Sequence, residues 1–183
     1  MTPTKAIIAG LFVLAGGLPA TAEILLGASI SATGPAGALG DPEAKTLEML
    51  VEDLNAKGGI NGETVKLVLY DDAGDPNKAR TFATRLVEDD EVVAIIGGTT
   101  TGTSMSILAV AEDAGVPFIS LAGAIDIIDP VKPFTFKTPH TDRMACQKIF
   151  ADMTARGLTK VAIVASTDGF GASMQGQGKL FSP

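Results

Sequence analysis

A hydroxyl-rich loop contains the strongest candidates for chemistry in this chain. In the run IIGGTTTGTS, from Ile95 to Ser104, a short apolar stretch is followed by two glycines, three threonines, a third glycine and two further hydroxyl residues. Three uses fit such a turn: a phosphate cradle, a catalytic nucleophile, or a cup of hydroxyls and amides for a small anion such as a carboxylate. Free N–H groups at the start of a following helix would favour a negative group there.

Two familiar phosphate-binding patterns do not match. The loop lacks the lysine of the G-x-x-x-x-G-K-[ST] motif, and GASISATG, at residues 27–34, does not fit the G-x-G-x-x-G dinucleotide fingerprint. A simpler interpretation is that Thr101 or Thr103 caps the next helix without any ligand. The local sequence leaves capping and anion binding equally open.

Catalysis and metal binding have little support in the residue inventory. His140 is the only histidine and Cys146 the only cysteine, and no second base accompanies a serine or cysteine in a recognisable motif. The run DDAGDPN, residues 71–77, has three carboxylates but lacks the spacing of a calcium loop, so it predicts a turn and a helix cap. We therefore expect no enzyme, no catalytic residue, no metal site and no cofactor.

The elements that must position the loop follow a regular alternation of strand-like and helix-like patterns. Near-continuous apolar runs predict strands that are covered on both faces. These runs are EILLGASIS (23–31), TVKLVLYD (64–71), VVAIIG (92–97) and VPFISL (116–121). Such an alternation predicts an α/β fold, with a doubly wound parallel sheet and helices on both faces. In open parallel sheets, ligands bind beyond the carboxyl ends of the strands, which is where the threonines lie.

Helix starts and apolar stripes support the same organisation. Asp41 and Pro42 are expected to open the first helix, whose apolar residues Leu47, Leu50, Val51 and Leu54 recur at helical spacing. Asp75 and Pro76 are expected to open the second, and a third runs from the threonine loop to about Ala114. Further on, PFTFKT (133–138) predicts a short edge strand, a helix spans about Asp142 to Arg156, and KVAIVAS (160–166) indicates a new sheet. The end, residues 174–183, has no apolar periodicity, and we expect that the chain is truncated there, where a further helix and strand would follow.

The first 22 residues have the features of a secretory signal. Lys5 precedes the apolar run from Ala6 to Leu18, and Ala20-Thr21-Ala22 forms an A-x-A cleavage site, so cleavage is expected after Ala22. The run is shorter than the roughly 20 apolar residues of a spanning helix. A net charge of −7 disfavours nucleic acid and anionic membranes as partners, and one cysteine allows no disulfide framework. The expected location is the periplasm.

The order of these motifs resembles the leucine/isoleucine/valine-binding proteins of ABC importers, which have the type 1 periplasmic binding fold. The similarity extends from about Ile24 to Gly171. It is carried by the run from SATGPAG to DPNKA (31–79), by IIGGTTTGTS, by AGVPFISLAGA (114–124) and by VAIVASTDGFG (161–171). Such proteins have two α/β lobes that close on an amino acid between them. The resemblance implies capture of branched-chain or related amino acids for a permease in the inner membrane, by a protein expected to be monomeric when full length.

The resemblance also implies particular ligand-binding residues. The hydroxyl loop, Thr99, Thr100 and Thr101, would receive the α-carboxylate of the amino acid. A second wall would come from Ala122, Gly123 and Ala124, although a hydroxyl residue often stands where Ala124 is. Leu39 and Phe170 match aromatic positions of the side-chain pocket. The acid that pairs with the ammonium group would lie further along the second lobe, and Asp142 and Asp168 are poor substitutes for it.

The signal pattern and the resemblance together predict three parts. Residues 1–22 are expected to be the signal peptide, 23–141 the first lobe of the ligand-binding domain, and 142–183 an incomplete start of a second, similar lobe. The alternative function is a ligand-sensing domain that reports to a receptor or regulator.

Overall fold

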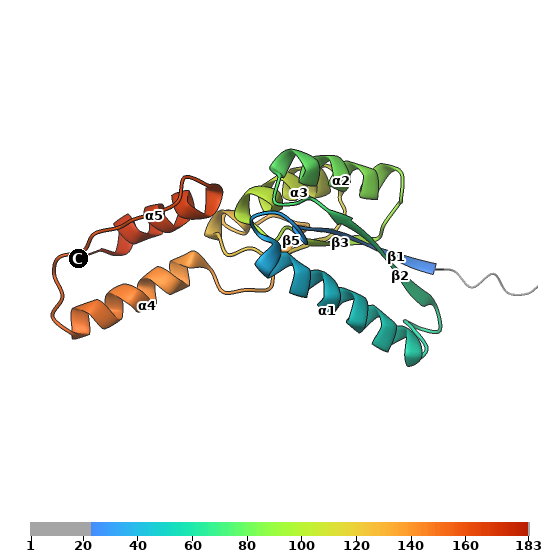
Figure 1. Ribbon diagram of the computed structural model, residues 1–183, viewed down its shortest axis with the longest axis horizontal. Helices are drawn as coiled ribbons and strands as arrows, with labels where there is room; N and C mark the ends of the chain where they lie inside the picture. The colour runs from blue at the N-terminus through green and yellow to red at the C-terminus, as the bar shows by residue number, and fades with distance from the viewer. Residues whose placement is uncertain (1–22, 183) are drawn as a thin grey trace, which may run out of the picture.

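The computed structural model describes residues 23–182. Most of them form an α/β fold around one parallel sheet, and the last two helices lie to one side of it (Figure 1). The five strands lie in the order β2-β1-β3-β4-β5, and every neighbouring pair is parallel. They are β1 (Glu23–Ile30), β2 (Thr64–Asp71), β3 (Ala94–Gly97), β4 (Phe118–Ser120) and β5 (Thr135–Lys137). The predicted edge strand is β5, which pairs with β4 and completes this sheet.

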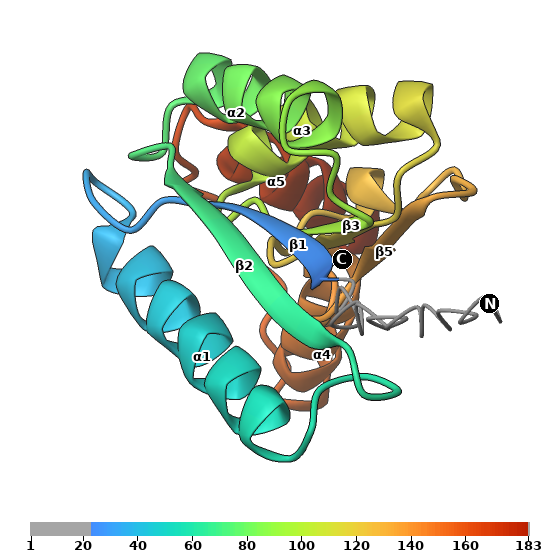
Figure 2. The same ribbon diagram turned by 90° about the vertical axis from the view of Figure 1, so that its right-hand side faces the viewer.

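Helices lie on both faces of the sheet, which confirms the predicted doubly wound fold. In Figure 2, α2 and α3 cover one face and α1 lies against the other. The helical segments are α1 (Gly37–Ala56), α2 (Pro76–Glu88), α3 (Thr101–Ala114), the 3-10 turn η1 (Ile125–Ile127), α4 (Asp142–Ala155) and α5 (Gly169–Phe181). None of these described helices is long and apolar enough to cross a membrane.

The larger core lies between the sheet and the pair α2 and α3. Leu86, Ile95, Ile107 and Phe118 are completely buried there. A smaller cluster, centred on Ala28, Ile30 and Ala44, lies under α1. Burial of this apolar surface is the main force that holds the strands in register, and with it the loops that follow them.

The first helix begins earlier than the sequence predicts. Its N-cap is Ala36, which offers no side-chain hydrogen bond, and Pro42 lies inside the helix. The chain already turns at Gly34, whose carbonyl accepts from the Gly37 N–H at 3.0 Å. Asp41 does not cap the helix but pairs with Lys45 at 2.7 Å on its exposed side. The second helix starts as predicted, because the Asp75 carboxylate accepts from the Asn77 N–H at 2.8 Å.

The segment after α4 differs from the expected new sheet. Residues 158–168 form no strand in the described part of the chain, although Val161, Ile163 and Val164 favour one. The last segment is helical despite its lack of apolar periodicity: α5 begins where the Asp168 carboxylate accepts from the Gly171 N–H. A strand needs a neighbour for its backbone hydrogen bonds, whereas a helix satisfies its own.

Candidate functional site

Loops at the carboxyl ends of three strands meet the start of α5 around a cavity of about 510 Å³. Its lining residues are Pro35, Ala36, Leu39, Gly74, Pro76, Thr100, Thr101, Gly102, Asp168, Gly169 and Phe170. The first three come from the β1–α1 connection and the start of α1, and the last three from the start of α5. Residues far apart in the sequence are thus brought to the edge of the sheet where parallel α/β folds bind ligands. We call this space the inter-loop cavity.

Four of the predicted site residues lie on the wall of the inter-loop cavity. Leu39, which is 61 % exposed, and Phe170, which is 45 % exposed, supply apolar surface from opposite ends of the described chain. Thr100 and Thr101 supply the start of α3. Pro35 and Gly74 also line the cavity but are not predicted from the sequence, because nothing in their local sequence shows that two loops meet at one place.

Thr100 is the cap of α3. Its Oγ1 accepts from the Thr103 N–H at 3.2 Å, and the Thr103 hydroxyl oxygen accepts from the Thr100 N–H at 3.1 Å. This reciprocal pair is a capping box, which satisfies two backbone donors that the helix leaves free. A threonine therefore does cap the helix, as one interpretation predicts. The N-cap is Thr100 rather than Thr101 or Thr103, and the Thr103 side chain accepts from the backbone of Thr100 as the second half of the capping box.

Thr99 points into the protein. Its Oγ1 accepts from the Ser31 N–H at 3.0 Å and donates to Glu43 Oε2 at 2.6 Å, and the residue is only 6 % exposed. Its one hydroxyl hydrogen is therefore committed to Glu43. The structure does not bring Thr99 to the wall of the inter-loop cavity.

Thr101 differs from both of its neighbours. It is the first residue of α3 and is 6 % exposed, yet its Oγ1 has no hydrogen-bond partner among the described residues. A buried hydroxyl without a partner costs about 1 to 3 kcal/mol. Such groups are rare in folded proteins and call for an explanation. The dipole of α3 and the free N–H groups at its start favour a negative group beside this residue.

The predicted second wall, residues 122–124, presents mainly backbone. Ala122 and Ala124 are buried in the main core, so their side chains do not reach a ligand. A methyl group on Gly123 would lie 3.3 Å from Phe170 Cε2, so the glycine lets the aromatic ring approach this backbone closely. The Gly123 carbonyl accepts from Lys137 Nζ at 2.9 Å and from the Asp142 N–H at 3.0 Å. These contacts hold the segment beside Phe170.

Asp168 brings a carboxylate to the inter-loop cavity. Its Oδ1 accepts from the Gly171 N–H and from the Ser166 hydroxyl, each at 2.8 Å. These two hydrogen bonds hold the pKa of Asp168 below its ordinary value. The group is therefore ionised at neutral pH. Asp142, the other acid considered, is buried and accepts from the Ile125 and Arg143 N–H groups, so it supports the fold.

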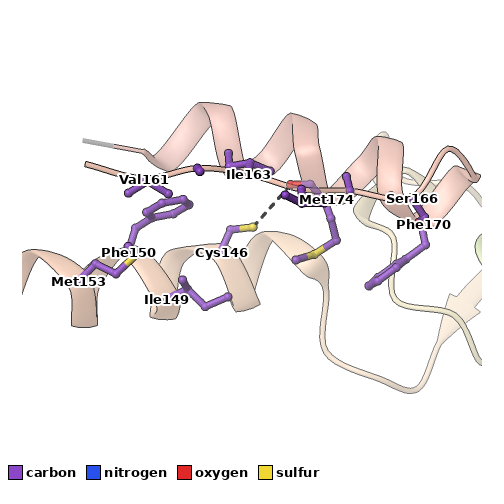
Figure 3. A pocket seen from close by; sticks show the side chains of 14 residues that line it. Cys146, Ile149, Phe150, Met153, Val161, Ile163, Ser166, Phe170 and Met174 are labelled. Atoms are coloured by element: carbon purple, nitrogen blue, oxygen red, sulfur yellow. Dashed lines mark hydrogen bonds between the residues drawn. The ribbon is translucent and has the colours of Figure 1, made fainter. Parts of the chain in front are cut away.

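A second, apolar space lies between α4 and α5 (Figure 3). This α4–α5 groove has a volume of about 430 Å³, and Cys146, Phe150, Val161 and Met174 are among the side chains that line it. Burial raises the pKa of the Cys146 thiol, as does the nearby charge of Asp142. The lining offers little to a carboxylate. Among residues 23–182 no group of three His, Cys, Asp or Glu side chains could hold a metal ion.

Comparison with known proteins gives a consistent picture. A sequence profile described as "Periplasmic binding protein" matches residues 23–180. Leu/Ile/Val-binding protein homolog 7 of Brucella suis is 42 % identical over 115 residues, which are 63 % of this chain and 29 % of that protein. The Leu/Ile/Val-binding protein of Escherichia coli K12 is 37 % identical over 119 residues, 64 % of this chain and 32 % of its own length. The chain thus spans about a third of these curated relatives.

Solved structures show the same fold. An extracellular ligand-binding receptor from Rhodopseudomonas palustris HaA2 superposes with a TM-score of 0.79 at 28 % identity, covering 88 % of this chain and 45 % of that one. LivJ from Streptococcus pneumoniae, solved in complex with isoleucine, superposes with a TM-score of 0.79 at 24 % identity, covering 88 % and 47 %.

The parallel sheet and its loops match one lobe of the type 1 periplasmic binding proteins. The chain belongs to the periplasmic binding protein family, in its Leu/Ile/Val-binding branch. Its members are binding proteins rather than enzymes, as the sequence predicts for this chain.

Proposed function

We propose that this chain carries the first lobe, and the start of the second, of a periplasmic solute-binding component of an ABC importer for branched-chain or related amino acids. The observation that carries the proposal is the buried Thr101 Oγ1, which lacks a partner at the start of α3. The substrate class is supported by relatives that are named for leucine, isoleucine and valine, and the permease is part of the proposal. Capture needs no reaction, so no catalytic residue is required.

The chemistry of the inter-loop cavity suits an amino acid. The α-carboxylate would take hydrogen bonds from the Thr101 hydroxyl and from free N–H groups at the start of α3. Leu39 and Phe170 would contact an aliphatic side chain, since both offer exposed apolar surface on the cavity wall. The ionised Asp168 adds negative charge to the same wall, which favours a ligand whose ammonium group neighbours its carboxylate.

The direct test is an NMR titration of the isotope-labelled chain with leucine, isoleucine and valine. We expect a dissociation constant weaker than about 1 mM, because the chain supplies only part of a closed cleft. The backbone amides of Thr101 and Gly102 should shift. Thr101→Ala should weaken binding by about tenfold or more, because it removes a hydrogen bond to a charged group. Thr101→Ser should retain binding.

A matched control is Ala122→Ser, which adds a hydroxyl at a buried position off the cavity wall. It should alter binding less than Thr101→Ala does. If Thr101→Ala leaves the titration unchanged, the threonine loop is simply a helix cap and the carboxylate proposal is wrong.

Export is the second part of the proposal, and it falls on residues 1–22, outside the described part of the chain. The charged start, apolar run and Ala20-Thr21-Ala22 support cleavage after Ala22. Mass spectrometry of a periplasmic extract should detect a mature chain that begins at Glu23. A chain that keeps Met1 in that extract would contradict it.

A further inference from the structure

A continuous set of hydrogen bonds joins three loops behind the inter-loop cavity. Glu43, on α1, accepts from the Thr99 hydroxyl at 2.6 Å, and Thr99 Oγ1 accepts from the Ser31 N–H at 3.0 Å. The Ser31 hydroxyl in turn donates to Asp72 Oδ1 at 2.7 Å. Glu43 is separated from Thr99 by 56 residues, and Ser31 from Thr99 by 68. The set therefore connects the segments that follow β1, β2 and β3.

One end of this set is rigidly held. Asp72 is completely buried and accepts from the Ser29 hydroxyl at 2.8 Å and from the Gly74 N–H at 2.9 Å, besides Ser31. Ser29 and Ser31 are also completely buried. A buried carboxylate with three donors is fully solvated by the protein, so this end has little freedom to move.

The other end depends on how closely α1 approaches the sheet. A side chain on Gly40 would collide with the Ser31 carbonyl, so the glycine lets α1 lie directly against the β1–α1 connection. This approach brings Glu43, one turn later, within reach of Thr99. Burial raises the pKa of Glu43, the Thr99 hydrogen bond lowers it, and the charge of Asp72 raises it again, with a net increase. Burial and the nearby charge of Asp72 thus disfavour the charged form of Glu43, whose contribution here is to accept the hydrogen bond from Thr99.

We propose that Glu43 is a positioning residue: by accepting the Thr99 hydroxyl it fixes the loop from which Thr101 contributes to the wall of the inter-loop cavity. Thr99 immediately precedes the capping residue Thr100, so its side-chain rotamer and the start of α3 are coupled through the backbone. Without Glu43 the Thr99 side chain is free to change its rotamer, and the Ser31 N–H then loses a well-placed acceptor. The consequence for ligand binding rests on the proposed function, whereas the ordering of the loop does not.

The primary test needs no ligand. In Glu43→Ala, amide hydrogen exchange at Ser31 should accelerate by about three- to tenfold, because its acceptor is no longer held, and the Thr101 amide resonance should shift. Glu43→Gln should resemble the wild type, since the amide oxygen still accepts. Glu48→Ala is the matched control: it lies on the exposed side of the same helix and should change neither signal.

Two further variants keep the test decisive if Glu43→Ala does not fold. Thr99→Val removes the hydroxyl that joins Ser31 to Glu43 and should also accelerate Ser31 exchange, whereas Thr99→Ser should not. Unchanged Ser31 exchange and Thr101 resonance in the alanine or valine variants would overturn the proposal, as would a glutamine variant that behaves like alanine.

A leucine titration then separates this proposal from the proposed function. If the wild type responds to leucine, Glu43→Ala should weaken the response and Glu43→Gln should retain it; an unaltered response in Glu43→Ala would show that the loop order does not reach the site. If the wild type does not respond, the proposed function fails, and the exchange data alone decide whether Glu43 orders the loop.

Discussion

The same kind of apolar sequence pattern forms paired strands in residues 23–141 and no strand in residues 142–182. In the first region each apolar strand has a parallel neighbour and at least one covering helix, and side chains such as Phe118 are completely buried. In the second region α4 and α5 lie side by side, and the apolar segment near Val164, which is 98 % exposed, pairs with no strand in the described structure (Figure 3). A strand pattern is realised only where neighbours supply hydrogen bonds and cover.

The largest expected difference is the loss of stability when a phenylalanine is replaced by alanine in each region. Phe118→Ala, in β4, should lower the free energy of unfolding by about 3 to 5 kcal/mol, because it leaves an enclosed cavity. Phe150→Ala, in α4, should cost much less, although Phe150 is only 7 % exposed, because it lines the open α4–α5 groove. Urea unfolding followed by circular dichroism measures both. Equal losses would mean that the two regions form one cooperative core.

A smaller difference is expected between two helix caps. Thr100 caps α3 inside the first region, and Thr141 caps α4 by accepting from the Met144 N–H at 3.2 Å. Thr100→Ala should lower global stability by about 1 kcal/mol. Thr141→Ala should instead increase amide exchange in the first turn of α4 and leave the urea midpoint nearly unchanged. A shift of that midpoint by Thr141→Ala would contradict the separation of the regions.

A local effect of pH is expected at the start of α5. The Gly171 N–H and the Ser166 hydroxyl hold the pKa of Asp168 below its ordinary value, so the folded state binds this proton less tightly than the unfolded state. The stabilising contribution is therefore present above the unfolded pKa and is lost as pH falls through the folded pKa. NMR should show the Gly171 amide losing protection in acid, and Asp168→Asn should remove this dependence. An identical acid profile in the variant would show that another group titrates there.

Val164→Lys is expected to have the smallest effect on stability but to reduce self-association measurably. Its side chain is almost fully exposed beside the α4–α5 groove, so the change should alter stability by less than about 0.5 kcal/mol. It should reduce self-association, because a charge interrupts an apolar, strand-forming run. Val131→Lys, at a site that is 91 % exposed in the first region, is the control. Light scattering at increasing concentration should show less self-association for Val164→Lys than for Val131→Lys. Equal effects of the two variants would argue against self-association through the α4–α5 groove.

The sequence alone determined the alternation of strands and helices, the start of α2 at Asp75 and Pro76, and the place of the threonine loop beyond a strand end. These features depend on residues close in sequence, whose periodicity and capping chemistry are local. It did not predict that α1 begins after Ala36, since that start depends on a turn at Gly34.

Only the tertiary structure decided what each threonine does. Three identical side chains stand in a row, yet Thr99 bonds to Ser31 and Glu43, Thr100 caps α3, and Thr101 keeps a buried hydroxyl without a partner among the described residues. A hydrogen bond needs a partner at the correct distance and angle, and the partners of Thr99 come from distant segments that the sheet brings together. Local sequence is uniform across the loop, so the direction of each hydroxyl is set by the packing of α1 and the strands around it.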